Sequence, residues 1–248
     1  MIIYGRKGDY FMEFKKAITL SFDDGMIYDE RMVELFNKYN LKCTFNLNAG
    51  LQAIEPYWQY PETDIKLYRK PIDELIPLYE GHEVAAHGYT HADLPNLSDE
   101  ELYKELSMDV YTLEEKFGYK IEGFAYPCGN YDKRTLDILK ELGIKYARTA
   151  KSSFETGIQE NLLEFAPSWH IPFHITSSEH SLKLDEAVNR FLSSAPDKPQ
   201  VLCLWGHSFE LEVNNSWDVF EDFLAKISNK DDIFYGTNKD VFKYFKLY

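Results

Sequence analysis

Ala17-Ile18-Thr19-Leu20-Ser21-Phe22-Asp23-Asp24-Gly25 begins as an apolar, β-branched run and ends in two carboxylates and a glycine. Such a run is typical of a buried strand. Successive strand side chains point to opposite faces, so Asp23 and Asp24 reach one pocket only if the chain turns at Gly25. Two adjacent ionised carboxylates repel unless a cation lies between them or one takes a proton. The pair favours one carboxylate on a metal and one acting on protons, although a plain helix cap explains an Asp before Gly equally well.

Predicted strands and helices alternate along the rest of the chain. Strands are expected at 43–47, 83–86, 121–126, 145–147, near 170, at 201–205 and at 233–235, and helices over 32–39, 72–79, 98–117, 136–142, 184–191, 217–227 and the C-terminal end. Repeated strand-then-helix units predict an α/β fold with a parallel sheet, and about seven units favour a (β/α) barrel. We expect a single barrel domain over 17–248 after an N-terminal extension, 1–16, in which Met12 is an alternative start.

Composition narrows the class of protein. The formal net charge of −14 argues against nucleic acid or an anionic membrane as the main partner. Three widely spaced cysteines without a C-x-x-C argue against a disulfide framework and a zinc ribbon. The N-terminus carries no apolar signal segment, and no stretch reaches the ~18 apolar residues of a membrane span. These features predict a cytoplasmic protein and leave its oligomeric state open.

Polar residues follow several predicted strands, and in a barrel the carboxyl ends of the strands meet at one face. The run His87-Gly88-Tyr89-Thr90-His91 places two imidazoles at i and i+4, where a helical turn would aim both at one metal. Together with Asp24 they would form a two-His, one-carboxylate set, which suits Zn²⁺ or a first-row neighbour. Taken alone, the histidine pair is explained equally well as a surface coincidence.

Three motifs occur in order: Ser21-Phe22-Asp23-Asp24-Gly25, His87-x-x-x-His91 and Leu204-Trp205-Gly206-His207. Their combination resembles the polysaccharide deacetylases, the NodB-homology group of carbohydrate esterase family 4, from about residue 17 to 207. The resemblance implies a distorted (β/α) barrel. It also implies a metal-dependent hydrolase that removes N- or O-acetyl groups from a carbohydrate, with an N-acetylglucosamine oligo- or polysaccharide as the expected substrate.

The same resemblance implies roles for individual residues. Asp24, His87 and His91 would bind a divalent metal, with zinc expected and cobalt or nickel as alternatives. Asp23 would be the base that activates water on the metal. His207 would be the acid that protonates the leaving amine, and a core histidine is the alternative for that position.

The third family motif, usually an Arg-Pro-Pro-Tyr-Gly-like run, reads Phe124-Ala125-Tyr126-Pro127-Cys128-Gly129 here. Ala125 stands at the arginine position, so we predict that Arg148, after another strand, orients Asp23 instead. A surface arginine is the alternative. Tyr126 and Cys128 are expected on the oxyanion or substrate-binding side, with Cys128 acting through its backbone N–H.

The usual Asp-Trp motif has no counterpart, and Trp169 and His174 lie in its region. His174 is a candidate for the wall of the site, with a core position as the alternative. Residues 51–70 are rich in Pro, Trp and Tyr and predict an irregular loop over the barrel mouth. Glu210, three residues after His207, is a candidate for orienting that histidine or capping its loop.

Two other functions stay open. One is hydrolysis of a different C–N bond, in a cyclic amide or a small N-acyl compound, which the missing signal segment favours. The other is an inactive barrel that binds carbohydrate. The presence of both Asp23 and His207 argues against the second, because a pure binder needs no base-and-acid pair.

Overall fold

The computed structural model describes residues 14–53, 58–61, 64–171 and 179–248. Its main sheet follows the order β7-β6-β5-β2-β1-β9-β8, with β10 paired to β1, and every pairing in it is parallel. The strands are β1 (Lys16–Asp23), β2 (Cys43–Leu47), β5 (Glu83–Ala86), β6 (Gly123–Ala125), β7 (Tyr146–Arg148), β8 (Trp169–His170), β9 (Gln200–Gly206) and β10 (Ile233–Tyr235).

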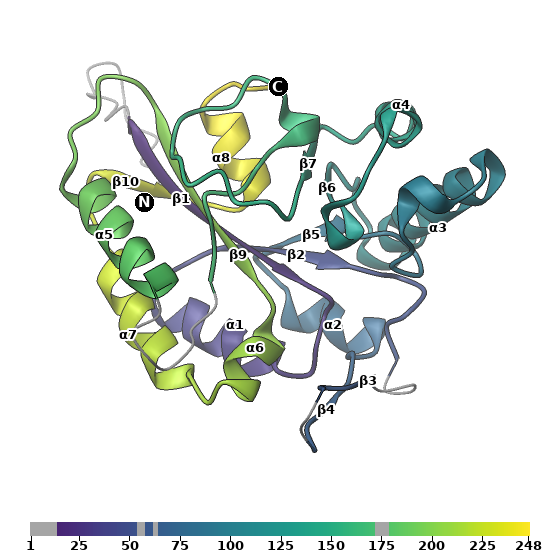
Figure 1. Cartoon of the computed structure of the whole chain (residues 1–248), viewed down its shortest axis with the longest axis horizontal. Helices are drawn as coiled ribbons and strands as arrows, with labels where there is room; N and C mark the ends of the chain where they lie inside the picture. The colour runs from purple at the N-terminus through teal and green to yellow at the C-terminus, as the bar shows by residue number, and fades with distance from the viewer. Residues whose placement is uncertain (1–13, 54–57, 62–63, 172–178) are drawn as a thin grey trace.

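The sheet curls rather than lying open (Figure 1). Phe165 pairs with β7 through its N–H to the Ala147 carbonyl at 3.0 Å, and Ser168 donates to the carbonyl of Cys203 in β9 at 2.8 Å. The segment leading into β8 therefore connects the two ends of the strand order. The prediction of a distorted (β/α) barrel of about seven strands is confirmed, with β10 as a short extra strand beside β1.

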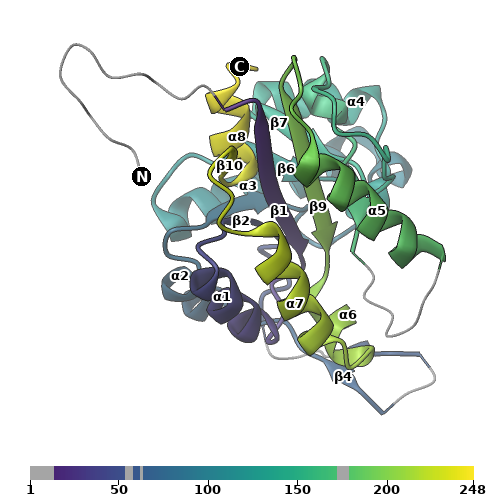
Figure 2. The ribbon, with the colours of Figure 1, turned by 90° about the vertical axis from the view of Figure 1, so that its left-hand side faces the viewer.

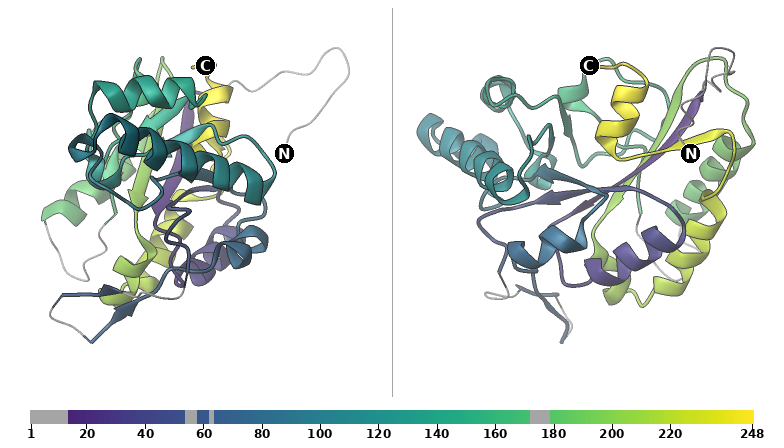
Figure 3. Two further views of the ribbon diagram at one scale, coloured as in Figure 1. Left: turned by 90° about the vertical axis from the view of Figure 1, so that its right-hand side faces the viewer. Right: turned by 180° about the vertical axis from the view of Figure 1, so that it is seen from behind.

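Helices cover the outside of the curled sheet. Figure 2 shows α5 and α7 beside β1 and β9, and Figure 3 shows α3 and α4 packed together on another side. Their bounds are α1 (Asp29–Lys38), α2 (Ile72–Leu78), α3 (Asp99–Phe117), α4 (Lys133–Glu141), α5 (Glu179–Ser193), α6 (Ser208–Val213), α7 (Trp217–Ile227) and α8 (Asn238–Tyr244). The sequence did not predict α6.

Helix α3 shows how local sequence sets these boundaries. Ser98 and Glu101 form a reciprocal capping box at its start, and Gly118 ends it at φ 74°, a conformation that glycine adopts without strain. The inward stripe is fully buried and consists of Leu102, Leu106, Val110 and Leu113. Each such side chain contributes about 1.5–3 kcal/mol by leaving water.

The sequence predicted an irregular loop over residues 51–70, but this segment is partly regular. It contains a two-stranded antiparallel hairpin, β3 (Trp58–Gln59) with β4 (Lys66–Leu67), which projects from the barrel in Figure 1. All three cysteines are free, in agreement with the sequence. No helix among the described residues is long and apolar enough to cross a membrane. Most of the predicted extension, residues 1–13, lies outside the described residues.

Candidate active site

The two carboxylates after β1 reach one pocket because the backbone turns sharply beyond that strand. Asp24 has φ 82° and Gly25 has φ 62°. Asp23 Oδ2 and Asp24 Oδ2 each lie 4.0 Å from Nε2 of His207, at the end of β9. The turn that the sequence predicted at Gly25 thus begins one residue earlier, at Asp24.

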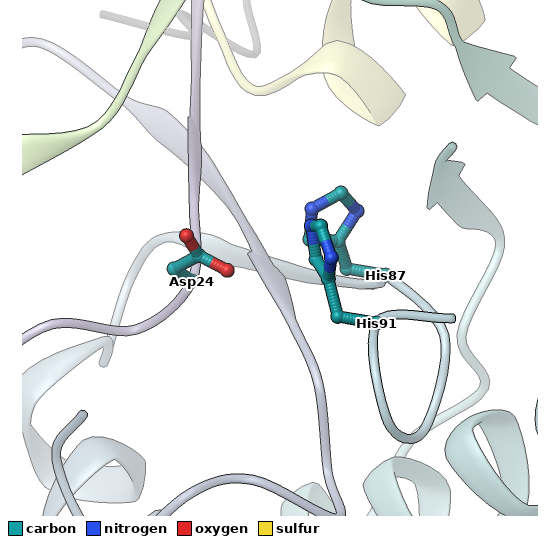
Figure 4. A group of neighbouring side chains, drawn as sticks. All are labelled: Asp24, His87 and His91. Atoms are coloured by element: carbon teal, nitrogen blue, oxygen red, sulfur yellow. The ribbon is translucent and has the colours of Figure 1, made fainter. Parts of the chain in front are cut away.

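Asp24, His87 and His91 form a set that suits a cation. One potential ligand atom from each lies within 4.8 Å of the others. Figure 4 shows the carboxylate facing the two rings, whose centroids are 4.8 Å apart. The ring Nδ1 of His87 pairs with the carbonyl of Ala125 at 2.7 Å, which leaves its Nε2 lone pair toward the carboxylates. Burial lowers the pKa of His87 to about 4, so the ring is neutral at pH 7, as a metal ligand must be.

The histidine pair does not lie on a helical turn, and that expectation was wrong. Gly88 and His91 both have positive φ, 77° and 57°, so the chain loops between the two rings. Two carboxylates of α3 bind the backbone of this loop. Asp109 accepts the N–H of His87 at 2.8 Å, and Glu105 accepts the N–H of Thr90 at 2.6 Å. Asp109 also accepts the N–H of Ala49, just after β2, at 2.7 Å.

Asp109→Asn should therefore weaken zinc binding about 10- to 100-fold, a typical loss when a partner that orients a metal ligand is changed. The amide replaces one of two acceptor oxygens with an NH₂ group that faces a backbone donor. Competition against a chromophoric chelator measures the Kd. Glu115→Gln, on the exposed side of the same helix, should bind zinc like the wild type. An unchanged Kd in Asp109→Asn would rule out this orienting role.

Arg148 lies against Asp23, the contact that the sequence analysis predicted for it. Its Nη2 is 2.5 Å from both carboxylate oxygens, and only 1% of the arginine side chain is exposed, so the surface alternative does not hold. Its guanidinium also lies 4.5 Å from the ring centroid of Trp205. Burial raises the pKa of Asp23, but the charges of Arg148, His87 and His207 outweigh it and hold that pKa below its usual value.

Arg69 is a second cation at the site, and the sequence analysis missed it. Its Nη2 lies 2.8 Å from Oδ1 of Asp24. Burial raises the pKa of Asp24, but Arg69 and the neighbouring histidines lower it to about 2. The residue is placed by pairing between its loop and the turn after β1, where Lys70 donates to the Gly25 carbonyl at 2.8 Å. No local sequence signal indicates such a long-range pairing.

His207 is held by a carboxylate from the first turn of α6, the helix that follows it. Oε2 of Glu210 lies 3.4 Å from Nδ1 of His207 and accepts that residue's backbone N–H at 3.0 Å. The same oxygen lies 3.0 Å from Nε2 of His170 in β8. Burial lowers the pKa of His207, but Glu210 and then Asp23 and Asp24 raise it to about 9, so the imidazolium persists at neutral pH. The expectation that Glu210 orients His207 agrees with this placement.

A buried carboxyl, that of Asp29, holds the start of α6 next to His207. Asp29, in the first turn of α1, accepts hydrogen bonds from Tyr79 at 2.5 Å and from the hydroxyl of Ser208. Burial raises the pKa of Asp29 to about 7. The Ser208 hydroxyl, next to His207, is thereby used to anchor α6 rather than to face the site.

The remaining predicted residues fall in different places. Tyr126 is buried. Its hydroxyl donates to the Leu163 carbonyl at 2.6 Å and its backbone N–H donates to the Arg148 carbonyl, so both groups are used in packing. Cys128 is exposed at φ 55°, and its N–H meets no acceptor in the described part of the chain. Trp169 is buried in β8. His174 lies outside the described residues.

Comparison with known proteins gives a consistent set of relatives. A family 4 carbohydrate esterase from Streptomyces lividans, in complex with acetate, aligns with a TM-score of 0.57 at 15% identity, covering 90% of this chain and 93% of that one. Chitin deacetylase 2 of Saccharomyces cerevisiae is 21% identical over 58% of this chain and 41% of its own length. Peptidoglycan deacetylase of Helicobacter pylori is 25% identical over 47% of this chain and 34% of its own length.

The chain spans between 32% and 65% of the length of the curated relatives that it matches. The polysaccharide deacetylase family model matches residues 13–147, more than half of the chain. That range holds Asp23, Asp24, His87 and His91 and ends before Arg148 and His207. With the barrel and the strand-end residues in place, the match shows that the chain belongs to the polysaccharide deacetylase family.

Proposed function

We propose that this chain is a metal-dependent hydrolase that removes acetyl groups from N-acetylated amino sugars. Family membership supports carbohydrate deacetylation in general. The observation that carries the finer proposal is the separation of two carboxylates, with Asp23 paired to Arg148 and Asp24 facing two histidines. Chitin and peptidoglycan, named for two relatives, both contain N-acetylglucosamine, which supports an acetamido sugar as substrate.

Asp24, His87 and His91 would hold the metal, and a bound zinc ion lowers the pKa of its water to about 7 and polarises a carbonyl. Asp23 accepts the proton of the attacking water, and Arg148 keeps this base ionised and oriented. The N–H of Cys128 is available to the oxygen on which negative charge develops. These groups lie at the carboxyl ends of β1, β5, β6 and β7, the edge of a barrel sheet where catalytic residues collect.

His207 would complete the reaction as the acid. An amine is a poor leaving group until it is protonated, so a positioned acid is needed when the C–N bond breaks. His207 Nε2 faces the two aspartates, and Glu210 stabilises the imidazolium through Nδ1. The ring can thus release the Nε2 proton to the nitrogen while Glu210 holds its orientation.

His207→Ala should lower the rate of acetate release from N-acetylglucosamine oligomers by about 10²- to 10⁴-fold, the usual contribution of a positioned acid or base. Zinc content should stay at the wild-type value at one equivalent of added metal. Glu212→Gln, on the same short helix, provides the matched control. Zinc-loaded wild type that releases no acetate from any acetylated sugar would overturn the substrate, and assays on cyclic amides and small N-acyl compounds would then follow.

A further inference from the structure

A second group of metal-binding side chains lies on the far side of the His207 ring. It consists of His170 from β8, His207 after β9 and Glu210 from α6, and one potential ligand atom from each lies within 4.8 Å of the others. Oε2 of Glu210 is 3.0 Å from Nε2 of His170 and 3.4 Å from Nδ1 of His207. All three side chains are partly exposed, at 20–26%. The Nδ1 atom of His207 is itself buried and has no hydrogen-bond partner among the described residues.

The donor set and its spacing suit zinc. Two imidazoles and one carboxylate are a common zinc ligand set. Zinc bonds of about 2.0–2.2 Å place tetrahedral ligands about 3.3–3.5 Å apart, close to the two separations from Glu210. The group shares no ligand with Asp24, His87 and His91, because His207 turns Nε2 toward the aspartates and Nδ1 toward Glu210.

We propose that His170, His207 and Glu210 form a second, inhibitory binding site for zinc or a similar divalent cation. The inhibitory consequence rests on the proposed function, in which His207 is the acid. A cation on Nδ1 takes the lone pair that holds the second ring proton, so the imidazolium cannot form. Glu210 then neutralises the cation instead of stabilising the protonated ring, and the leaving amine receives no proton.

Metal stoichiometry tests the site independently of catalysis. Equilibrium dialysis of metal-free protein against excess zinc, followed by elemental analysis, should give two bound equivalents for the wild type. His170→Gln should keep one equivalent, and His91→Ala should keep the other. Glu212→Gln, whose carboxyl on α6 pairs with the indole N–H of Trp217, should still bind two. Far-UV circular dichroism checks that each variant is folded.

Activity gives the second arm of the test. Zinc beyond the first equivalent should lower wild-type acetate release at least about 10-fold, and His170→Gln should lose this inhibition. A wild type that saturates at one equivalent, or a His170→Gln variant that still binds two, overturns the second site. A protein that binds two equivalents but releases no acetate even at one equivalent of zinc contradicts the proposed function and leaves the second site standing.

Discussion

Asp23→Asn should lower kcat/KM for acetate release about 10²- to 10⁴-fold and still bind the first equivalent of zinc, because the variant removes the proposed base without touching a proposed metal ligand. In the wild type Arg148 contacts both oxygens of Asp23, and the asparagine keeps one of these oxygens. It cannot accept the proton of the attacking water at neutral pH. Steady-state kinetics and elemental analysis on the same preparation measure the two quantities.

The neighbouring residue supplies the matched comparison. Asp24→Asn changes the next side chain by the same atoms, but it removes the charged oxygen ligand that faces His87 and His91. We expect this variant to lose zinc affinity and, at one equivalent of added zinc, to lose activity with it. If both variants lose zinc alike, or if Asp23→Asn stays active, the division of roles between the two carboxylates is wrong.

Arg148→Met should lower the free energy of unfolding by about 3–5 kcal/mol, because it leaves the buried carboxylate of Asp23 without its partner. The two side chains are almost fully shielded, with 1% and 4% exposed, so water cannot replace the guanidinium. Urea unfolding measures the change. Arg31→Met, whose ion pair with Asp218 is exposed, should cost less than about 1 kcal/mol.

The pH dependence of that loss has a definite sign. The folded protein holds the pKa of Asp23 below its usual value, so the ion pair stabilises the fold above pH ~4 and less as the pH falls further. The gap in stability between wild type and Arg148→Met should thus be largest near neutral pH and shrink in acid. The double variant Arg148→Met/Asp23→Asn should recover part of the loss, since no unpaired charge remains. A gap that widens in acid would contradict the assignment.

Several elements of the fold follow from short stretches of sequence. The run ending at Asp23, the capping box at Ser98 and the stripe behind it are local patterns, and the structure has a strand and a helix at those positions. Helix α6 and the β3–β4 hairpin were missed because each is too short to show periodicity. The helical turn predicted for His87 to His91 was wrong because hydrogen bonds from α3, and not the local helical preference, set the backbone of this loop.

By itself, the sequence determined which chemical groups follow the strands: the Asp23–Asp24 pair, the two histidines and His207. It also pointed to Arg148 through the absence of the usual arginine. Only the tertiary structure decided which groups meet, since contacts of Arg69 with Asp24, Asp109 with His87 and His170 with Glu210 join residues 22 to 45 positions apart. The physical reason is that strand periodicity depends on neighbouring residues in the sequence, whereas the pairing of charges depends on how the curled sheet brings distant strand ends together.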